Sequence, residues 1–479
     1  MPTTTNTAEV ALTADDMGAL LGDWSQSAHG SLARRLASAV RRTVEAGLLA
    51  DGARLPPERA LAAALAVSRT TVTAAFDELR ADGVVASRQG SGTVVRSRPS
   101  PKFASSRVAE HLQQLPGIDL AAGNPPDPSH WPPITLDVAD LIAEGGGPGL
   151  QPLGLPALRE AVAAQYSASQ RLTDVAQVHI TAGAHQALSL VAGALLEPGD
   201  AVAVEDSSYP GMFDIIEHHG LRAVPVATDR AGMRPDALEQ VLRQDRPKVV
   251  YVQAGPHNPT GRVPSPSRLR GLAAVLDRHG AVVVEDATLA ELAFGGRVRP
   301  ELADLCRRVT VVSVGSLSKV AWGGLRVGWM RAPAPLVERT MHLRLAGDLG
   351  GSVPSQLLAL RLLPHLEHMA VRRRAVLAEL MAQALLLLAT DLPEWAVAEP
   401  AGGSVLWAQL PVIDSGPFCQ LARRHGVHVA PGAVARPGRA PDPHIRICVD
   451  RPWNVVEEGI RRLVVAWQDW RADDAVVLG

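Results

Sequence analysis

Five short runs of apolar residues recur along the C-terminal part of the chain, and they constrain the fold more than any other feature. The runs are VHIT (178–181), AVAVED (201–206), KVVYVQ (248–253), AVVVED (281–286) and VTVVSVG (309–315). Apolar runs of strand length that alternate with helical stretches are typical of a mostly parallel sheet covered by helices on both faces. We therefore expect a buried α/β sheet from about residue 119 onward.

Glycines and polar residues follow the ends of these runs. They are Gly183, Ala184, His185, Tyr209, Asn258, Asp286, Ser316, Ser318 and Lys319. Sheets of this class bind their ligands just beyond the carboxyl ends of the strands. The five strand ends are therefore expected to converge on one pocket.

The segment GSLSKVAWGGLRVGW (315–329) surrounds a single lysine with hydroxyl groups, glycines and an arginine. Ser316, Ser318 and Arg326 are the kinds of donor from which a phosphate site is built. A lysine beside such a site can form an imine with an aldehyde whose phosphate is anchored there. Pyridoxal 5'-phosphate (PLP) is such a molecule, and a carboxylate such as Asp286 can keep its pyridine nitrogen protonated. These residues thus indicate a PLP site on Lys319.

The first hundred residues carry a different pattern. Helices are predicted over 30–46 and 57–65, and Ser68 is a suitable N-cap for a third helix that ends at Gly83. The apolar stripes that should face the core are Leu32, Leu36, Val40 and Val44 in the first helix and Val72, Phe76 and Leu79 in the third. Helical periodicity thus accounts for residues 30–83.

The runs VVASR (84–88) and TVVRS (93–97) flank residues 89–92, whose composition is that of a tight hairpin. Three helices followed by a hairpin give the element order of a winged helix-turn-helix. Such a module places the first turn of its recognition helix in the DNA major groove. The third helix begins with arginine and threonine, which suit phosphate and base contacts, and the hairpin glycines allow close approach to the minor groove.

The charge distribution supports a polyanion-binding N-terminal part. Between Ser25 and Arg98 the chain has eleven arginines and six acidic residues, a local balance of +5. The net charge of the whole chain is −2, so the remainder carries −7. A basic segment joined to an acidic body indicates a nucleic-acid-binding module attached to a second function.

Cysteine usage and hydropathy exclude several classes of protein. Cys306, Cys419 and Cys448 are far apart and form no CxxC pair, so a disulfide scaffold and a zinc finger are excluded, and we expect no metal site. No apolar stretch is long enough for a transmembrane helix, and the first residues do not resemble a secretory signal. We expect a cytoplasmic protein with no membrane partner.

The domain organisation follows from these changes in pattern. We predict a DNA-binding domain over residues 25–97, a linker over 98–118 that is mixed in Pro, Ser and charge, and a ligand-binding domain over 119–475.

The run GARLPPERALAAALAVSRTTVTAAFDELRADGVVASRQGSGTVV (52–95) resembles the GntR family of transcription regulators. The resemblance implies a winged helix-turn-helix that binds double-stranded operator DNA. It also implies DNA contacts by Arg59, Ser68, Arg69, Thr70, Thr71, Thr73 and Gly90.

The motifs TAGAHQALSL, EDSSYPG, AGPHNPTG, VVVEDA and SLSKVAWGGLRVGW resemble the fold type I PLP-dependent aminotransferases, and PAGGSVLWAQL and HIRICVD resemble their smaller C-terminal subdomain. By this resemblance Lys319 is the Schiff-base lysine, Asp286 is the pyridinium partner, and Arg446 grips a substrate or effector carboxylate. Asn258 contacts the ring oxygen and Tyr209 the ring. The phosphate is held by Ser316, Ser318, Arg326 and the backbone of Gly183, Ala184 and His185.

A GntR-like module joined to an aminotransferase-like body is the arrangement of the MocR subgroup. The fold class expected is therefore multidomain α/β. The subgroup implies a regulator whose body senses PLP, an amine or an amino acid and thereby controls operator binding. It also implies a head-to-tail homodimer.

Two departures from the aminotransferase pattern leave alternatives open. Tyrosines are common in that family near Thr288 and at Leu150. Their absence puts efficient transamination in doubt without preventing PLP binding. One alternative is a genuine PLP-dependent aminotransferase that carries a DNA-binding module. The other is a regulator that senses a non-PLP ligand, against which the presence of both Lys319 and Asp286 argues.

Overall fold

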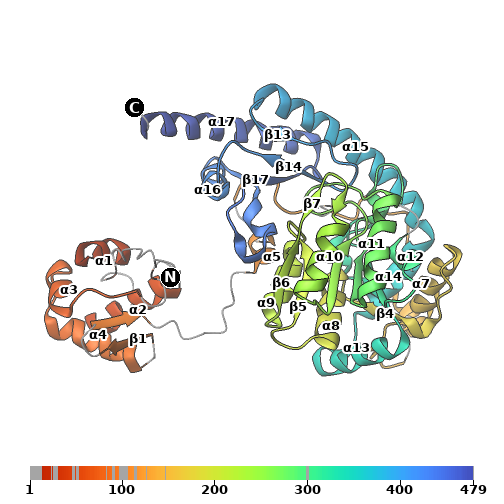
Figure 1. Cartoon of the computed structure of the whole chain (residues 1–479), viewed down its shortest axis with the longest axis horizontal. Helices are drawn as coiled ribbons and strands as arrows, with labels where there is room; N and C mark the ends of the chain where they lie inside the picture. Colours follow the sequence, from red (N-terminus) through yellow and green to blue (C-terminus); the bar gives the residue numbers. More distant parts are fainter. Residues whose placement is uncertain are drawn as a thin grey trace. The chain divides into compact units, whose positions relative to one another are not determined.

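The computed structural model describes residues 13–22, 24, 31–45, 49, 53–81, 84–88, 92–95, 106–112, 116–123, 125, 127–145, 147–297 and 301–477. The chain divides into two compact units, Met1–Ser105 and Ser106–Gly479 (Figure 1). We refer to them as the N-terminal unit and the body.

The N-terminal unit has the element order of a winged helix-turn-helix. Its elements are α1 (Ala14–Leu21), α2 (Leu32–Glu45), α3 (Glu58–Ala64), α4 (Arg69–Ala81), β1 (Val85–Arg88) and β2 (Gly92–Val95). The two strands pair in antiparallel fashion, with Val85 opposite Val95. The three predicted helices and the hairpin are therefore confirmed.

The predicted apolar stripes form the core of this unit with one exception. Val72, Phe76 and Leu79 of α4 are fully buried, as are Leu36 and Val40 of α2, and Val44 packs against them. Leu32 is 47% exposed, so its assignment to the core is wrong. It is the first residue of α2.

The body is built on a seven-stranded sheet with the strand order β4-β12-β11-β10-β9-β5-β6. The strands are β4 (Val178–Thr181), β5 (Ala201–Glu205), β6 (Arg222–Val226), β9 (Val249–Gln253), β10 (Val282–Asp286), β11 (Val311–Ser316) and β12 (Gly328–Arg331). Neighbouring strands are parallel except β12, which is antiparallel to both β11 and β4. The five predicted strands are thus confirmed as β4, β5, β9, β10 and β11.

Helices cover both faces of this sheet, and two hydrophobic cores result. On one face α8, α9 and α13 pack against residues such as Val204 and Val314. On the other face α10 and α11 pack against Ala203 and Val283. Burial of alternate side chains on opposite faces explains why these strands are apolar throughout.

Helices alternate with the strands of the seven-stranded sheet from β4 to β11, and three helices follow β12 in succession. The helices of the body are α5 (Arg107–Leu112), α6 (Val138–Glu144), α7 (Pro156–Ala168), α8 (Ala184–Leu195), α9 (Pro210–His218), α10 (Pro235–Gln244), α11 (Pro266–His279), α12 (Leu302–Leu305), α13 (Ala334–Gly347), α14 (Val353–Leu362), α15 (Leu366–Asp391), α16 (Gly416–Arg424) and α17 (Trp453–Val477). α5 lies within the range predicted as a linker.

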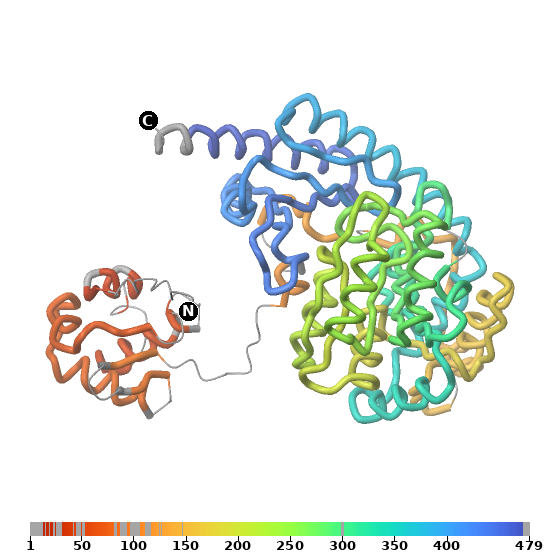
Figure 2. The backbone as a smooth tube through the Cα atoms, in the orientation of Figure 1, coloured from red at the N-terminus to blue at the C-terminus, as the bar shows by residue number. Residues whose placement is uncertain are grey.

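A smaller subdomain is formed mainly by the C-terminal part of the body (Figure 2). Its strands are β13 (Ala396–Val397), β14 (Val405–Gln409), β16 (Ala430–Pro431) and β17 (His444–Cys448), in the order β13-β14-β17-β16. Short pairs are also formed by β3 (Ile118–Asp119) with β15 (Val427–His428) and by β7 (Thr228–Asp229) with β8 (Gly232–Met233). Helices α15, α16 and α17 pack on this subdomain around Trp395 and Phe418.

Two kinds of feature are absent from the part of the chain that the structure describes. None of the described helices has both the length and the apolar character needed to cross a membrane. The described His, Cys, Asp and Glu side chains form no group of three or more that is arranged to hold a metal ion.

Candidate functional site

A cavity of about 640 Å³ lies at the ends of the body's central strands. The side chains that line it include Ala184, His185, Tyr209, Asn258, Asp286, Ser316, Ser318, Lys319, Arg326 and Arg446. The structure therefore brings together the residues that the sequence assigned to one pocket, and Gly183 directly precedes the lining residue Ala184.

Lys319 is held in the cavity beside two hydroxyl groups. Its Nζ donates a hydrogen bond to the carbonyl oxygen of Gly123 at 2.6 Å. The hydroxyl groups of Ser316 and Ser318 lie 2.8 Å apart. Burial, together with the nearby guanidinium of Arg446, lowers the pKa of Lys319 to about 8. A larger fraction of this amine is therefore unprotonated near neutral pH than in an exposed lysine.

Asp286 ends β10 with its carboxylate engaged on both oxygens. The hydroxyl of Tyr251 donates to Oδ2 at 2.7 Å, and the N–H of Thr288 donates to Oδ1 at 2.9 Å. Burial raises the pKa of Tyr251, so its phenol stays protonated and remains a donor. Sequence reasoning treated Tyr251 only as a strand residue. A polar aromatic inside an apolar run is the signal that could have identified it.

The start of α8 also lies at the cavity, where Ala184 and His185 line it. Gly183 is the N-cap of this helix at φ +97, and no side chain caps the helix there. The guanidinium of Arg326 donates to the carbonyl oxygen of Ala182. A Cβ at Gly183 would lie 3.3 Å from Arg326 Nη1, and one at Gly328 would lie 2.7 Å from Gly183 Cα. Glycine is therefore needed for helix, arginine and strand to meet here, and uncapped N–H groups beside a cation form an anion site.

Tyr209 and His185 form an aromatic part of the cavity wall. Their rings meet edge to face, with centroids 6.3 Å apart, and Tyr209 Oη lies 3.4 Å from His185 Nδ1. Burial raises the pKa of Tyr209 and lowers the pKa of His185. Both groups are therefore held in their neutral forms.

Arg446 lies on β17 of the smaller subdomain, and its side chain lines the cavity. Its Nη1 donates to Asn258 Oδ1 at 3.1 Å and its Nη2 to the carbonyl oxygen of Ala121 at 2.8 Å. Its Nε is buried without a hydrogen-bond partner among the described residues. Gln253 fixes the backbone of Asn258 through two hydrogen bonds. Its Oε1 accepts from the Asn258 N–H at 2.9 Å, and its Nε2 donates to the Asn258 carbonyl oxygen at 3.0 Å. Gln253 was also missed by the sequence reasoning.

The two departures from the aminotransferase pattern occupy different places. Thr288 lines the cavity, and its buried Oγ1 has no hydrogen-bond partner in the part of the chain that the structure describes. Leu150 is 60% exposed and does not line the cavity. Thr288 therefore places a hydroxyl group in the cavity wall, whereas Leu150 offers none.

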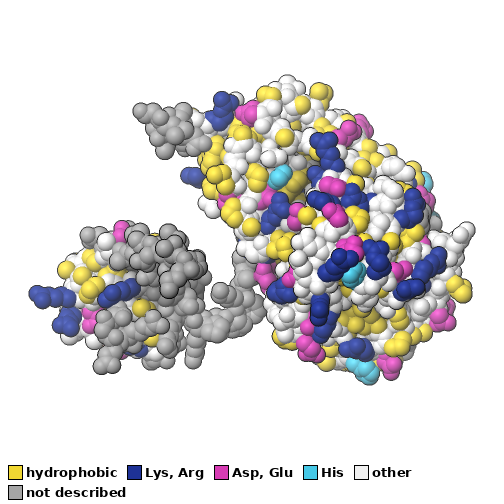
Figure 3. Space-filling model, viewed as in Figure 1, with side chains coloured by type: hydrophobic (Ala, Val, Ile, Leu, Met, Phe, Trp, Pro, Cys, Tyr) yellow, Lys and Arg dark blue, Asp and Glu magenta, His cyan; other side chains and the backbone are white. Residues whose placement is uncertain are grey.

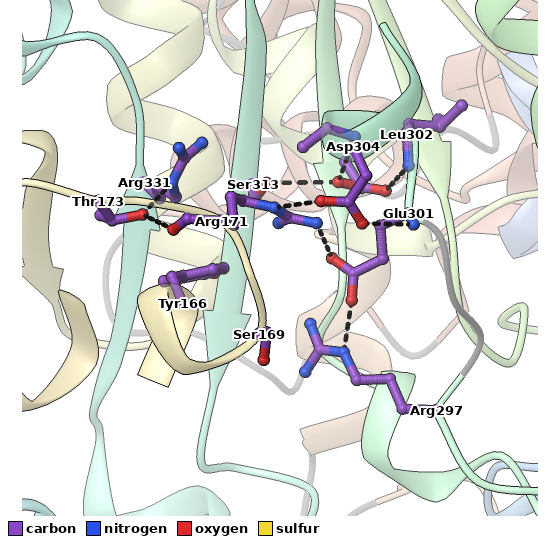
Figure 4. Close-up of polar contacts among 12 residues, drawn as sticks. Tyr166, Ser169, Arg171, Thr173, Arg297, Glu301, Leu302, Asp304, Ser313 and Arg331 are labelled. Carbon is purple, nitrogen blue, oxygen red and sulfur yellow. Dashed lines mark hydrogen bonds and ion pairs between the residues drawn. The ribbon is translucent and has the colours of Figure 1, made fainter. Parts of the chain in front are cut away.

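A buried ionic network supports β10 from behind the cavity (Figure 4). Glu285 points away from Asp286, as neighbours in a strand do, and accepts from the N–H of Leu302 at 2.8 Å. Arg171 pairs with Glu301 at 2.8 Å and with Asp304 at 2.9 Å. Burial and the nearby Glu301 raise the pKa of Glu285. This network fixes the strand that carries Asp286.

The N-terminal unit exposes the start of α4. Ser68, Arg69 and Thr70 are exposed, and so is Arg59 on α3. Ser68 Oγ accepts the N–H of Thr71 at 3.1 Å, so the predicted N-cap is confirmed. Basic side chains gather at one edge of the visible described surface of this unit (Figure 3). The arrangement is suited to phosphate and base contacts.

Thr73 is half-buried, as Thr71 is, but its hydroxyl bonds to a second helix. It donates to Glu58 Oε2 on α3 at 2.8 Å. Arg80 pairs with the other oxygen of Glu58 at 3.2 Å. Glu58 thus joins α3 to α4 through two side chains. Gly90 lies outside the described residues.

Comparisons with known proteins match both units. The model of the family "Aminotransferase class I and II" matches residues 116–463, and that of "Bacterial regulatory proteins, gntR family" matches residues 32–95. The chain is similar to the HTH-type transcriptional regulator TauR of Rhodobacter capsulatus, with 30% identity over 85% of this chain and 90% of that protein. It is also 33% identical to the vitamin B6 salvage pathway transcriptional repressor PtsJ of Salmonella typhimurium, over 69% of this chain and 73% of that protein.

Among solved structures, the body resembles LysN, an α-aminoadipate aminotransferase of Thermus thermophilus complexed with N-(5'-phosphopyridoxyl)-L-leucine. The TM-score is 0.70 at 28% identity, and the match covers 78% of this chain and 97% of that chain. The chain therefore belongs to the aminotransferase class I and II family and, through its gntR-type N-terminal unit, to the MocR subgroup of the GntR transcription regulators.

Proposed function

We propose that this transcription regulator binds PLP as a Schiff base on Lys319 and that occupancy of the cavity by PLP, or by PLP with an amino compound, controls its affinity for operator DNA. The observation that carries the proposal is the position of Lys319. Its amine has a lowered pKa and shares one cavity with Asp286 and the start of α8, in a chain whose N-terminal unit exposes Arg69 on a recognition helix. Residues 25–97 would then read DNA and residues 119–475 would sense the ligand.

The residues present fit PLP at each of its polar positions. PLP supplies an aldehyde that condenses with a primary amine and a ring that accepts electrons. The uncapped α8 N-terminus, Arg326, Ser316 and Ser318 would hold the phosphate. Asp286 would hold the pyridine nitrogen, with Tyr251 keeping the carboxylate in place. Tyr209 would contact the ring and Asn258 its oxygen.

Arg446 supports an effector with a carboxylate. A buried guanidinium nitrogen without a partner is costly, and an anion is the partner that relieves the cost best. Arg446 Nε is in this position at the cavity wall. An amino acid would engage Lys319-bound PLP through its amine and Arg446 through its carboxylate. PtsJ is a transcriptional repressor of a vitamin B6 salvage pathway, and the similarity of this chain to it supports PLP itself as a second candidate effector.

Ligand binding in the cavity and operator binding would be coupled through thermodynamic linkage. A ligand changes operator affinity only as far as it prefers one of two conformations of the protein. Two body copies in a head-to-tail homodimer would present two winged helices to a two-fold operator.

The composition of the chain makes the Schiff-base assignment directly testable. The chain has only three lysines, Lys102, Lys248 and Lys319. Borohydride reduction of the purified protein, followed by peptide mass spectrometry, should find the phosphopyridoxyl mass on Lys319. Lys319→Ala should lose the visible absorbance of the bound cofactor. Lys248→Ala is the matched control, because Lys248 is exposed and pairs with Asp200 at the surface.

The sensor proposal is tested by measuring the dissociation constant for DNA from the region upstream of the chain's own gene. We expect it to change when PLP, or PLP with an amino acid, is added. A wild-type protein that carries no phosphopyridoxyl mass on Lys319, or whose DNA affinity no such addition alters, would contradict the proposal. Sustained turnover of an amino donor with a keto acid would favour the aminotransferase alternative.

A further inference from the structure

Arg107 is a charged side chain that is almost completely buried at the start of the body. It is 1% exposed and is the first residue of α5. Its guanidinium forms ion pairs with Glu217 and Asp214 of α9, donates to the carbonyl oxygen of Arg436 at 3.0 Å, and lies 4.8 Å from the ring centre of Phe213. A buried guanidinium with this many partners fixes the position of the backbone that carries it.

Asp214 fixes the same turn of α5 a second time. Its Oδ2 accepts from Ser106 Oγ at 2.7 Å and from the N–H of Val108 at 3.0 Å, and its Oδ1 accepts from the N–H of Arg107 at 2.9 Å. One carboxylate thus accepts three hydrogen bonds, from Ser106 and from the first two residues of α5. Helix α9 therefore determines where α5 begins.

Helix α9 also forms a wall of the cavity. Its N-cap is Tyr209, and both Tyr209 and Pro210 line the cavity. Val108 of α5 lines the cavity as well. The anchor of Arg107 and the wall that faces Lys319 are therefore parts of the same two helices.

A third set of contacts joins α5 to the smaller subdomain. Arg436 and Arg439 lie in the segment between β16 and β17, and β17 carries Arg446 into the cavity. Arg436 accepts the hydrogen bond from Arg107, and Arg439 pairs with Glu110 of α5 at 2.9 Å. α5 is thus held by both parts of the body that enclose the cavity.

We propose that α5 transmits the occupancy of the cavity to the N-terminal unit, with Arg107 as the positioning residue that makes α5 respond. The proposal rests on the proposed function. The chain that leaves β2 at Val95 enters the body at Ser106, so α5 is the first part of the body on the path from the winged helix. A ligand that shifts the start of α9 or the segment between β16 and β17 must also shift α5, because Arg107 contacts both.

The experiment compares the full-length protein with three variants. Arg107→Met removes the charge and keeps an unbranched side chain, Arg107→Lys restores a cation, and Glu110→Gln removes the negative charge that pairs with Arg439. Arg222→Met is the matched control, since it breaks a surface ion pair with Asp245. For each protein the probe is PLP, alone and with each common amino acid. The readouts are the visible absorbance of bound cofactor and the ratio of DNA dissociation constants with and without the probe.

We expect Arg107→Met to keep the cofactor absorbance but to lose the effect of the probe on DNA binding. Its DNA dissociation constants with and without the probe should differ by no more than about twofold. Arg107→Lys should recover part of the wild-type ratio, Glu110→Gln should reduce it less, and Arg222→Met should leave it unchanged. In the wild type, amide hydrogen exchange of residues 106–112 should slow when PLP binds.

An Arg107→Met protein that binds PLP and retains the wild-type ratio would overturn the proposal. So would a wild-type protein whose exchange at residues 106–112 is the same with and without PLP. If Arg107→Met does not fold, two other results together would rule out α5 as the transmitting helix. These are a Glu110→Gln protein with the wild-type ratio of DNA dissociation constants, and a wild-type protein whose amide exchange at residues 106–112 does not change when PLP binds. If the DNA affinity of the wild-type protein does not change with PLP, alone or with any amino acid, the proposed function itself fails. That result is distinct from a failure of the role of α5.

Discussion

The N-terminal unit and the body present their candidate binding residues in opposite ways. On the N-terminal unit, Arg69 and Thr70 come from one turn of one helix and are exposed. In the body, Lys319, Asp286 and Arg446 come from three separate elements, and each is held by hydrogen bonds to other residues. The first site is a surface that exists as soon as α4 folds. The second exists only when the whole body is folded.

This difference determines what a substitution does. Removal of an exposed side chain removes its contacts with the partner and leaves the unit's own stability nearly unchanged. Removal of a buried partner leaves another buried group without a hydrogen bond, so binding and stability fall together.

The largest effect is expected at Asp286. Asp286→Ala should lower PLP affinity on the order of 100-fold or more, because a buried charge partner is lost. It should also lower the free energy of unfolding by about 2 kcal/mol, because the hydroxyl of Tyr251 loses its acceptor. PLP titration by absorbance and urea unfolding of the PLP-free protein measure the two quantities.

Asp286→Asn separates these two effects. The amide oxygen can still accept from Tyr251, so stability should be largely retained while PLP affinity falls. Asp245→Ala is a surface control, because Asp245 pairs with the exposed Arg222. An Asp286→Ala protein that binds PLP as tightly as the wild type would show that the cavity does not depend on this carboxylate.

The pH dependence of PLP uptake tests the environment of Lys319. Only the unprotonated amine attacks an aldehyde, and the pKa of Lys319 is lowered to about 8. The initial rate of absorbance gain in PLP-free protein should therefore rise roughly 50-fold from pH 6 to pH 8 and then level off. A rate that keeps rising tenfold per unit up to pH 10 would indicate an ordinary, exposed lysine.

An intermediate effect is expected at Arg69. Arg69→Ala should weaken operator binding by roughly tenfold to a hundredfold, because an exposed arginine at the start of a recognition helix supplies phosphate or guanine contacts. Cofactor absorbance and the unfolding midpoint should not change. Gel-shift titration at fixed salt checks the first point, with Arg222→Ala as a control for loss of one surface arginine. Unchanged operator affinity would remove α4 from the DNA interface.

The sequence predicted the residues of both candidate sites better than it predicted the residues that hold the cavity of the body in place. Apolar runs and their polar ends were enough to identify β10, β11 and the cluster around Lys319, because strand position alone brings these residues together. Tyr251 and Arg107 were missed because their partners are far away in the sequence, and Gln253 was missed because its bonds to Asn258 depend on the shape of the loop between them. The strand β12 was missed because its residues, GWMR, do not form an apolar run.

The smallest effect is expected at Thr73. This residue is the exception to the contrast between exposed binding residues in the N-terminal unit and hydrogen-bonded ones in the body. The sequence grouped Thr73 with the DNA contacts, but its hydroxyl donates to Glu58 and so behaves like the supporting residues of the body. Thr73→Val should therefore lower the stability of the N-terminal unit by about 1 kcal/mol, whereas the exposed Thr70→Val should change stability by less than about 0.5 kcal/mol. Thermal unfolding monitored in parallel with operator binding distinguishes the two. If Thr73→Val weakens binding more than Thr70→Val at equal stability, Thr73 contacts DNA directly, and the hydrogen bond to Glu58 is given up in the complex.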